Sequence, residues 1–233
     1  MIPKRPHFGP EDIGHCAMPS DDFGVPLLDL EAQATRLDLP FCRWGRQRRK
    51  SRMRGTWHFM TDDRRFTGLW ARPYDLLNSG CVSAVECNYS VTDDTPLAVA
   101  LYLTYRKRYL ARLWQDLGGV RILVDLNVSE RHAVTNLCGV PRGWGAYCTR
   151  GSVTRMGALD ADLARATEHA AGEKLLFVVY GGGAAVVDWC RDRGVFHFPE
   201  EREEVRLGER WQEQDGGESP LHSPCGDLGL LIR

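Results

Sequence analysis

The chain has 233 residues, 43% of them hydrophobic and 26% charged, so it can bury one substantial core and is not a wholly disordered protein. Its formal net charge of -1 excludes a polycation that coats nucleic acid indiscriminately. Its apolar runs are far shorter than the ~20 residues that span a bilayer, and the first residues lack the apolar core of a secretion signal. We therefore expect a cytoplasmic protein with no membrane partner.

The composition changes twice along the chain. Residues 1–56 lack hydrophobic periodicity and are predicted to form an irregular, partly basic leader. Residues 57–199 alternate between apolar and helical patterns and are predicted to form one α/β domain. Residues 200–233 are rich in Glu, Arg, Gly and Ser and are predicted to form a flexible, polar tail.

Short apolar runs indicate strands at residues 81–87, 120–126, 145–149, 175–180 and 194–198. Helical patterns separate most of them, at residues 96–117, 158–171 and 184–193. Strands that alternate with helices indicate βα units with right-handed crossovers. We expect a mainly parallel sheet flanked by helices, and the pattern leaves open whether it is barrel-like or doubly wound.

The clearest helical pattern begins at Pro96, after the acidic pair Asp93–Asp94, and ends at Gly118–Gly119. The acidic pair is interpreted as capping and first-turn charge in preference to a metal site, because acidic residues favour the start of a helix. Its predicted buried stripe recurs at helical spacing, at Leu97, Leu101, Tyr105, Tyr109 and Leu113.

Metal and hydrolase motifs are missing from the sequence. The eight cysteines include no Cys-x-x-Cys pair, so we interpret them as reduced, mostly structural thiols, with zinc binding as the alternative. The seven histidines form no His-x-His or His-Glu-x-x-His motif, and no serine lies in a Gly-x-Ser-x-Gly motif. No metal ligand is assigned, and the cofactor is unknown.

Polar and glycine residues follow the predicted strands. Ligands of parallel α/β folds bind at the carboxyl ends of the strands. We therefore expect one pocket there, lined by Asn88, Ser90, Asn127, Thr149, Tyr180, Gly181, Gly182 and Gly183.

Two features of this edge have a chemical and a structural interpretation. Asp125 lies among Ile, Leu and Val, and is a candidate catalytic acid or base, although capping a loop or pairing with an arginine is the more common role of such an acid. The Tyr180–Gly183 turn precedes a predicted helix, whose N-terminus favours anions. Three glycines at such a turn also occur where the backbone needs positive φ or tight packing.

Residues 43–54 carry seven positive charges and no acid, with Trp44 inside the segment and Trp57 nearby. Such a segment suits contact with the phosphate backbone of DNA or RNA, and the alternative is a solvated linker. Arg106, Lys107, Arg108 and Arg112 form a second basic group on the helix that begins at Pro96. The candidate nucleic-acid-binding residues are Arg46, Arg48, Arg49, Lys50, Arg52 and Arg54.

Four segments carry a family resemblance: residues 58–70, 88–96 and 105–108, and the Tyr180–Gly183 turn. In order and spacing they resemble the bacterial and phage family known as domain of unknown function 4417. The resemblance implies a phage or mobile-element context. The family pattern has an aspartate where this chain has Asn88 and favours a tryptophan after the second strand, so catalytic roles do not transfer directly.

Two functions remain open. The first is a nucleic-acid-associated protein of a phage or mobile element, with the basic segment on phosphate and the strand-end pocket holding a nucleotide or strand end. The alternative is a small-molecule or nucleotide-processing enzyme that uses the same pocket, with Asp125 as acid or base. The sequence does not decide whether the protein is an enzyme, nor its oligomeric state.

Overall fold

The computed structural model describes residues 18–45 and 53–200. These residues form one sheet of seven strands in chain order, and every neighbouring pair is parallel. The strands are β1 (Phe41–Arg43), β2 (Thr56–His58), β3 (Ser83–Val85), β4 (Arg121–Asp125), β5 (Ala146–Arg150), β6 (Leu176–Tyr180) and β7 (Phe196–Phe198). The predicted α/β fold with a parallel sheet is confirmed.

The sequence patterns located five of these strands and missed β1 and β2. Both missed strands, Phe-Cys-Arg and Thr-Trp-His, have three residues, whereas the equally short β3 and β7 lie inside the longer apolar runs that indicated them. The two missed strands flank the arginine-rich segment, whose polarity hides them. β1 also lies within the range 1–56 that was expected to be irregular.

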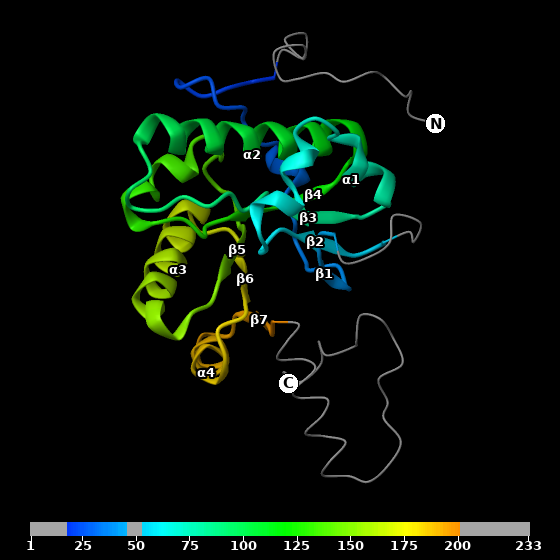
Figure 1. Cartoon of the computed structure of the whole chain (residues 1–233). Coiled ribbons are helices and arrows are strands. Elements are labelled where there is room, and N and C mark those ends of the chain that lie inside the picture. The colour runs from blue at the N-terminus through cyan, green and yellow to red at the C-terminus, as the bar shows by residue number, and fades with distance from the viewer. Residues whose placement is uncertain (1–17, 46–52, 201–233) are drawn as a thin grey trace, which may run out of the picture.

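In the part of the chain that the structure describes, four α-helices lie around the outside of the curved sheet (Figure 1). They are α1 (Tyr74–Ser79), α2 (Leu97–Gly118), α3 (Met156–Ala170) and α4 (Ala184–Arg193), and the last three match the predicted helices to within two residues at each end. Short 3₁₀ turns occupy connections: η2 (Leu30–Ala32), η3 (Asp63–Arg65), η4 (Thr67–Leu69), η5 (Glu130–His132), η6 (Thr135–Leu137) and η7 (Val153–Arg155).

The sheet curls until its first and last strands approach each other, which makes it nearly a barrel. The Phe41 ring on β1 lies 4.8 Å from the Phe198 ring on β7, measured between centroids. Between them, His58 stacks on Phe41 at 4.5 Å and contacts Tyr180 at 4.4 Å. Aromatic rings therefore close the gap that backbone hydrogen bonds would close in a complete barrel.

The buried face of α2 differs from the predicted stripe. Leu97 is 60% exposed, whereas Leu110 and Trp114 are fully buried. The first three residues of the helix are exposed, whereas Tyr109 and Leu113 of the predicted stripe are buried. The covered face also includes Lys107 and Arg108 in place of an unbroken apolar stripe. The capping prediction was also wrong, because Pro96 is the cap residue and no side chain caps the helix.

The structure describes six cysteines, Cys42, Cys81, Cys87, Cys138, Cys148 and Cys190, and the last five are free thiols. Four of the six are buried, and burial raises the pKa of the Cys87 and Cys148 thiols. They serve as small core residues. Within the described ranges, no helix is both long and apolar enough to span a bilayer.

Candidate functional site

Asn88 and Asn127 meet at the carboxyl edge of the sheet, after β3 and β4. Asn127 Nδ2 donates to Asn88 Oδ1 at 3.2 Å, and Asn88 Nδ2 lies 3.3 Å from Met60 Sδ after β2. Asp125 ends β4 beside them, where its Oδ1 accepts the Asn127 backbone N–H at 3.2 Å. Three of the residues predicted for this edge are thus in direct contact.

Two other predicted pocket residues point elsewhere. Ser90 is exposed and donates both its backbone N–H and its hydroxyl to the Asp63 carboxylate, each at 3.0 Å. Thr149 is buried and donates its hydroxyl to Asp162 on α3 at 2.7 Å, so it faces the helix that packs on β5. Both lie near the carboxyl edge, but neither contacts Asn88.

The turn Gly181–Gly183 has a structural explanation. All three glycines adopt positive φ, at 74°, 101° and 73°. A Cβ on Gly182 would lie 2.8 Å from the backbone of Gly151 and closer still to Val186, so a side chain there would displace the start of α4. Gly181 N donates to the Phe198 carbonyl at 2.7 Å, so this N–H is already hydrogen-bonded to β7. Anion binding at this turn stays a prediction.

Four buried charged residues form the densest electrostatic feature of this edge, and we call Glu86, Lys107, Arg108 and Asp125 the buried charge cluster. Arg108 forms an ion pair with Glu86, which follows β3. Lys107 Nζ lies 3.3 Å from Asp125 Oδ2 and 3.1 Å from the Asp125 carbonyl. Two acids from strand ends thus neutralise two bases from α2.

The cluster also fixes the long connection after β4. Arg108 donates to the carbonyls of Asn136 and Cys138. Asn136 Nδ2 donates to the Asp125 carbonyl at 2.8 Å. Arg108 therefore links α2 to residues 136–138, a region in which the sequence showed only a weak helical pattern.

Burial disfavours both charges of the Lys107–Asp125 pair. Desolvation lowers the pKa of Lys107 and raises the pKa of Asp125, and the attraction between the two charges opposes both shifts. Both Asp125 oxygens already accept hydrogen bonds, and the side chain has no exposed surface. This geometry matches the loop-capping, ion-paired role of such an acid, and catalysis by Asp125 stays a prediction.

The second basic group is therefore different from a solvated helix face. Lys107 and Arg108 are buried and paired with acids. Arg112 donates to the Leu27 carbonyl and pairs with Asp116. Arg106 lies against aromatic rings, 4.8 Å from the Trp70 centroid.

His58 lies inside the sheet between Phe41 and Tyr180. Burial, with a contribution from the Arg43 charge, lowers the pKa of His58 to about 3, so the imidazole is neutral near pH 7. Its Nδ1 lies 3.4 Å from the Met60 backbone N–H, in position to accept. His58 is an uncharged packing element at neutral pH.

A pocket of about 590 Å³ opens between the connections that follow β3, β4 and β5. None of the residues predicted for the strand-end pocket lines it. Ser129 Oγ is buried there and has no hydrogen-bond partner within the described part of the chain. The lining residues are Val91, Thr92, Asp93, Ser129, Glu130, Arg155, Gly157, Ala158 and Ala161.

Asp162 lies one residue beyond the pocket-lining Ala161 and is 8% exposed. Burial raises the pKa of its carboxyl group to about 7. Arg165 connects it to the pocket, because one guanidinium nitrogen lies 3.1 Å from Asp162 and another 2.7 Å from Glu130. A carboxyl group that titrates near pH 7 is suited to proton transfer, and the sequence analysis did not identify Asp162.

The arginine-rich segment is described only at its ends. Arg46, Arg48, Arg49, Lys50 and Arg52 lie outside the described residues, whereas Arg54 is described and exposed. Trp44 N donates to the His58 carbonyl at 2.9 Å, and Met53 N donates to the Ser79 carbonyl at 2.9 Å. The segment therefore starts at the carboxyl end of β1 and is anchored on both sides.

Glu86 and the bases of α2 had a signal in the sequence. Glu86 and Asp125 are the acids inside predicted strands, and buried acids need partners. Lys107 and Arg108 lie in the Tyr105–Arg108 motif at the centre of a helix that packs on those strands. The pocket had no such signal, because its three connections converge only in the folded chain.

Comparisons with known proteins agree with a phage context. The "Gene 1 protein" of Mycobacterium phage D29 is 35% identical over 66 residues, which cover 28% of this chain and 24% of that protein. No solved structure matches the chain. The family described as Domain of unknown function (DUF4417) matches residues 18–161, which include β1 to β5, the buried charge cluster and all the residues that line the pocket. The chain belongs to the DUF4417 family.

Proposed function

We propose that this protein binds nucleic acid through the arginine-rich segment 43–54 in a phage or mobile-element setting. The observation that most strongly supports this proposal is the charge density of the segment, which has seven basic residues and no acid among twelve. The whole chain has net charge -1 and this segment contributes +7, so the remainder carries -8. The basic segment is thus a local polyanion-binding element on an otherwise acidic protein.

The anchoring of the segment supports this proposal. β1 ends at Arg43 and β2 begins at Thr56, so the segment leaves from the carboxyl edge of the sheet. Trp44 packs edge-on against Trp57, with ring centroids 5.3 Å apart, which fixes the start of the segment. Fixing both ends lowers the entropic cost of ordering the segment on a phosphate backbone.

The test is equilibrium binding of labelled DNA and RNA across a range of salt concentrations. Replacing Arg48, Arg49 and Lys50 together with alanine should weaken binding to all sequences alike. If each side chain contacts one phosphate, the slope of log affinity against log salt should flatten by about 3 for duplex DNA.

The matched control removes the same charge elsewhere. Arg36, Lys174 and Arg191 are exposed and lie outside the segment, and their triple alanine variant should keep the parent slope. Equal loss of binding in both triple variants would show that net charge alone attracts nucleic acid. Equal binding by the parent and the Arg48/Arg49/Lys50 variant at low salt would refute the proposal.

The 590 Å³ pocket favours a second candidate function, a small-molecule or nucleotide-processing enzyme. Its supports are the pocket's place at the carboxyl edge, the unpartnered Ser129 hydroxyl and the nearby Asp162 carboxyl group. Screening nucleotides and sugar phosphates by thermal shift, with Arg155→Ala as the comparison, tests this alternative. A ligand that stabilises the parent and not the variant would favour it, and turnover lost in Asp125→Asn would assign the base to Asp125.

A further inference from the structure

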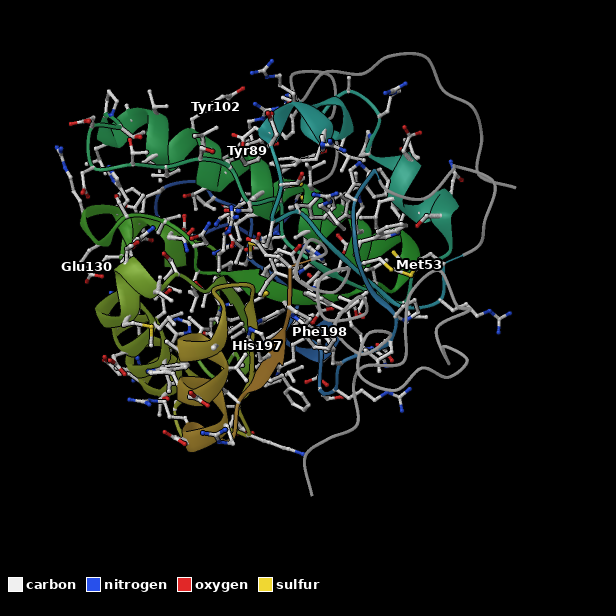
Figure 2. The ribbon with its side chains drawn as sticks, turned by 60° about the horizontal axis from the view of Figure 1, so that its bottom comes forward. Met53, Tyr89, Tyr102, Glu130, His197 and Phe198 are labelled. Carbon is white, nitrogen blue, oxygen red and sulfur yellow. The ribbon has the colours of Figure 1, made fainter. Side chains whose placement is uncertain are left out.

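Arg106 lies among three aromatic rings on the outer face of α2. Its guanidinium carbon is 4.8 Å from the Trp70 centroid, 4.9 Å from that of Tyr89 and 5.8 Å from that of Tyr102. Figure 2 shows Tyr89 and Tyr102 close together beside α2. Tyr105 continues the surface, with its ring 6.4 Å from Trp70. We call Trp70, Tyr89, Tyr102, Tyr105 and Arg106 the aromatic platform.

The aromatic platform has one cation, Arg106, and one solvent-exposed ring, that of Tyr102. Among the described residues, no carboxylate forms an ion pair with Arg106, whose Nε is buried without a hydrogen-bond partner. The rings hold this cation in place of an acid. Tyr102 is 50% exposed, so its ring is open to solvent.

Two more arginines border the platform. Asp63 accepts two hydrogen bonds from Ser90, which places η3 beside Tyr89. The next residues on η3 are Arg64, whose side chain is 92% exposed with only a 3.6 Å contact to Asp62, and the exposed Arg65. The surface therefore combines the exposed Tyr102 ring with two exposed arginines.

We propose that the aromatic platform binds single-stranded nucleic acid, with an unpaired base stacked on Tyr102 and phosphates on Arg64 and Arg65. This inference rests on the proposed function for the partner class and adds a second contact surface, on a different part of the fold from residues 43–54. Bases stack on aromatic side chains whatever their identity, so binding of this kind tolerates sequence changes.

The chemistry selects single strands over duplex. In a duplex the base faces are covered by neighbouring bases, and an exposed tyrosine ring reaches only the backbone and groove edges. In a single strand each base face is free to stack on Tyr102 while the adjoining phosphates reach Arg64 and Arg65. The arginine-rich segment has no such preference, because it contacts phosphate in either form.

The experiment measures the affinity of the full chain for an oligothymidylate of about 15 nucleotides and for a duplex of equal length. Tyr102→Ala should weaken single-strand binding about tenfold and leave duplex binding unchanged. Tyr102→Phe keeps the ring and should bind like the parent. Phe23→Ala, which removes a 68% exposed aromatic ring elsewhere, is the matched control and should have no effect.

A second measurement locates the contact directly. Irradiating the complex with a bromouracil-substituted single strand should cross-link the peptide that carries Tyr102. Cross-links confined to residues 43–54, with unchanged affinity in Tyr102→Ala, would overturn the platform and leave the proposed function standing. No binding of either nucleic acid by the parent at low salt would overturn both.

Discussion

The two arginine-rich stretches of this chain are both dense in basic residues but differ in the acids available to them within the sequence and the described structure. Residues 43–54 have no acid of their own, and the structure describes none of Arg46 to Arg52. In the Tyr105–Arg108 motif, by contrast, Lys107 and Arg108 are buried against Asp125 and Glu86. A run of basic residues thus indicates a solvated surface only where no acid from another element reaches it, and the acids that decide this lie far away in the sequence.

The strongest test of this comparison is Arg108→Ala. The change leaves the Glu86 carboxylate buried without its partner and removes the donor to the Asn136 and Cys138 carbonyls. We expect the free energy of unfolding in urea to fall by about 3–5 kcal/mol. Arg64→Ala, at an exposed site, is the control and should cost less than about 0.5 kcal/mol. A loss below about 1 kcal/mol for Arg108→Ala would contradict a structural role for this ion pair.

A double-mutant cycle measures the interaction energy of the second buried pair, Lys107 and Asp125. Lys107→Met removes the base and leaves the buried Asp125 carboxyl group without its counter-charge, so we expect a loss of about 3 kcal/mol. Adding Asp125→Asn removes the unpaired carboxyl group and should restore part of that loss, giving a coupling energy of about 1–3 kcal/mol. Strictly additive losses would mean that the two side chains do not stabilise each other.

The pH dependence of stability tests the buried His58 on β2, the strand that follows the basic segment. The pKa of His58 is lowered from 6.5 to about 3 in the fold. At acid pH the imidazole is therefore protonated in the unfolded chain and neutral in the folded chain. Stability from this group is complete above pH 6.5 and is lost as the pH falls towards 3. At about pH 5 the loss should be about 2 kcal/mol relative to neutral pH.

His58→Phe provides the comparison for that measurement, because it keeps a ring between Phe41 and Tyr180 and removes the titrating group. Unfolding of both proteins is followed in urea between neutral and acid pH. The gap between their stabilities should change with pH in favour of the variant on acidification. Parallel pH profiles would show that His58 titrates normally in the fold.

The smallest expected effect on stability comes from the basic segment itself. The buried acids that the structure describes, Glu86, Asp125 and Asp162, already pair with bases elsewhere in the fold. We therefore expect alanine at Arg48, Arg49 and Lys50 to change the free energy of unfolding by less than about 0.5 kcal/mol. Chemical denaturation of this variant checks the expectation beside the binding assay. A loss comparable to that of Arg108→Ala would mean that these side chains pair with acids of the fold.

The sequence predicted three of the four described α-helices and five of the seven described strands, and missed α1, β1 and β2. The apolar run at residues 175–180 and the helix at 184–193 were located because their patterns are local. β1 and β2 form only in register with their neighbours, through pairs such as Arg43 with His58, and three residues carry no period of their own.

The sequence indicated which polar residues end neighbouring strands, but not the pocket or the contacts around them. Asn88, Asp125 and Asn127 do meet at the carboxyl edge, as parallel strands require. The sequence did not show that Lys107 would reach Asp125, or that the connections after β3, β4 and β5 would enclose a pocket around Ser129. Those contacts depend on how α2 and α3 dock on the sheet, which composition and spacing do not encode.

The ring contacts between β1 and β7 also affect how the sheet closes. A barrel closed by hydrogen bonds must match strand number, stagger and tilt around its whole circumference. Here the Phe41 and Phe198 rings meet at 4.8 Å across strands that share no backbone ladder in the described residues. Closure by side chains carries no register requirement. Seven strands therefore curl into a nearly closed sheet without a backbone ladder between the two outer strands in the described residues.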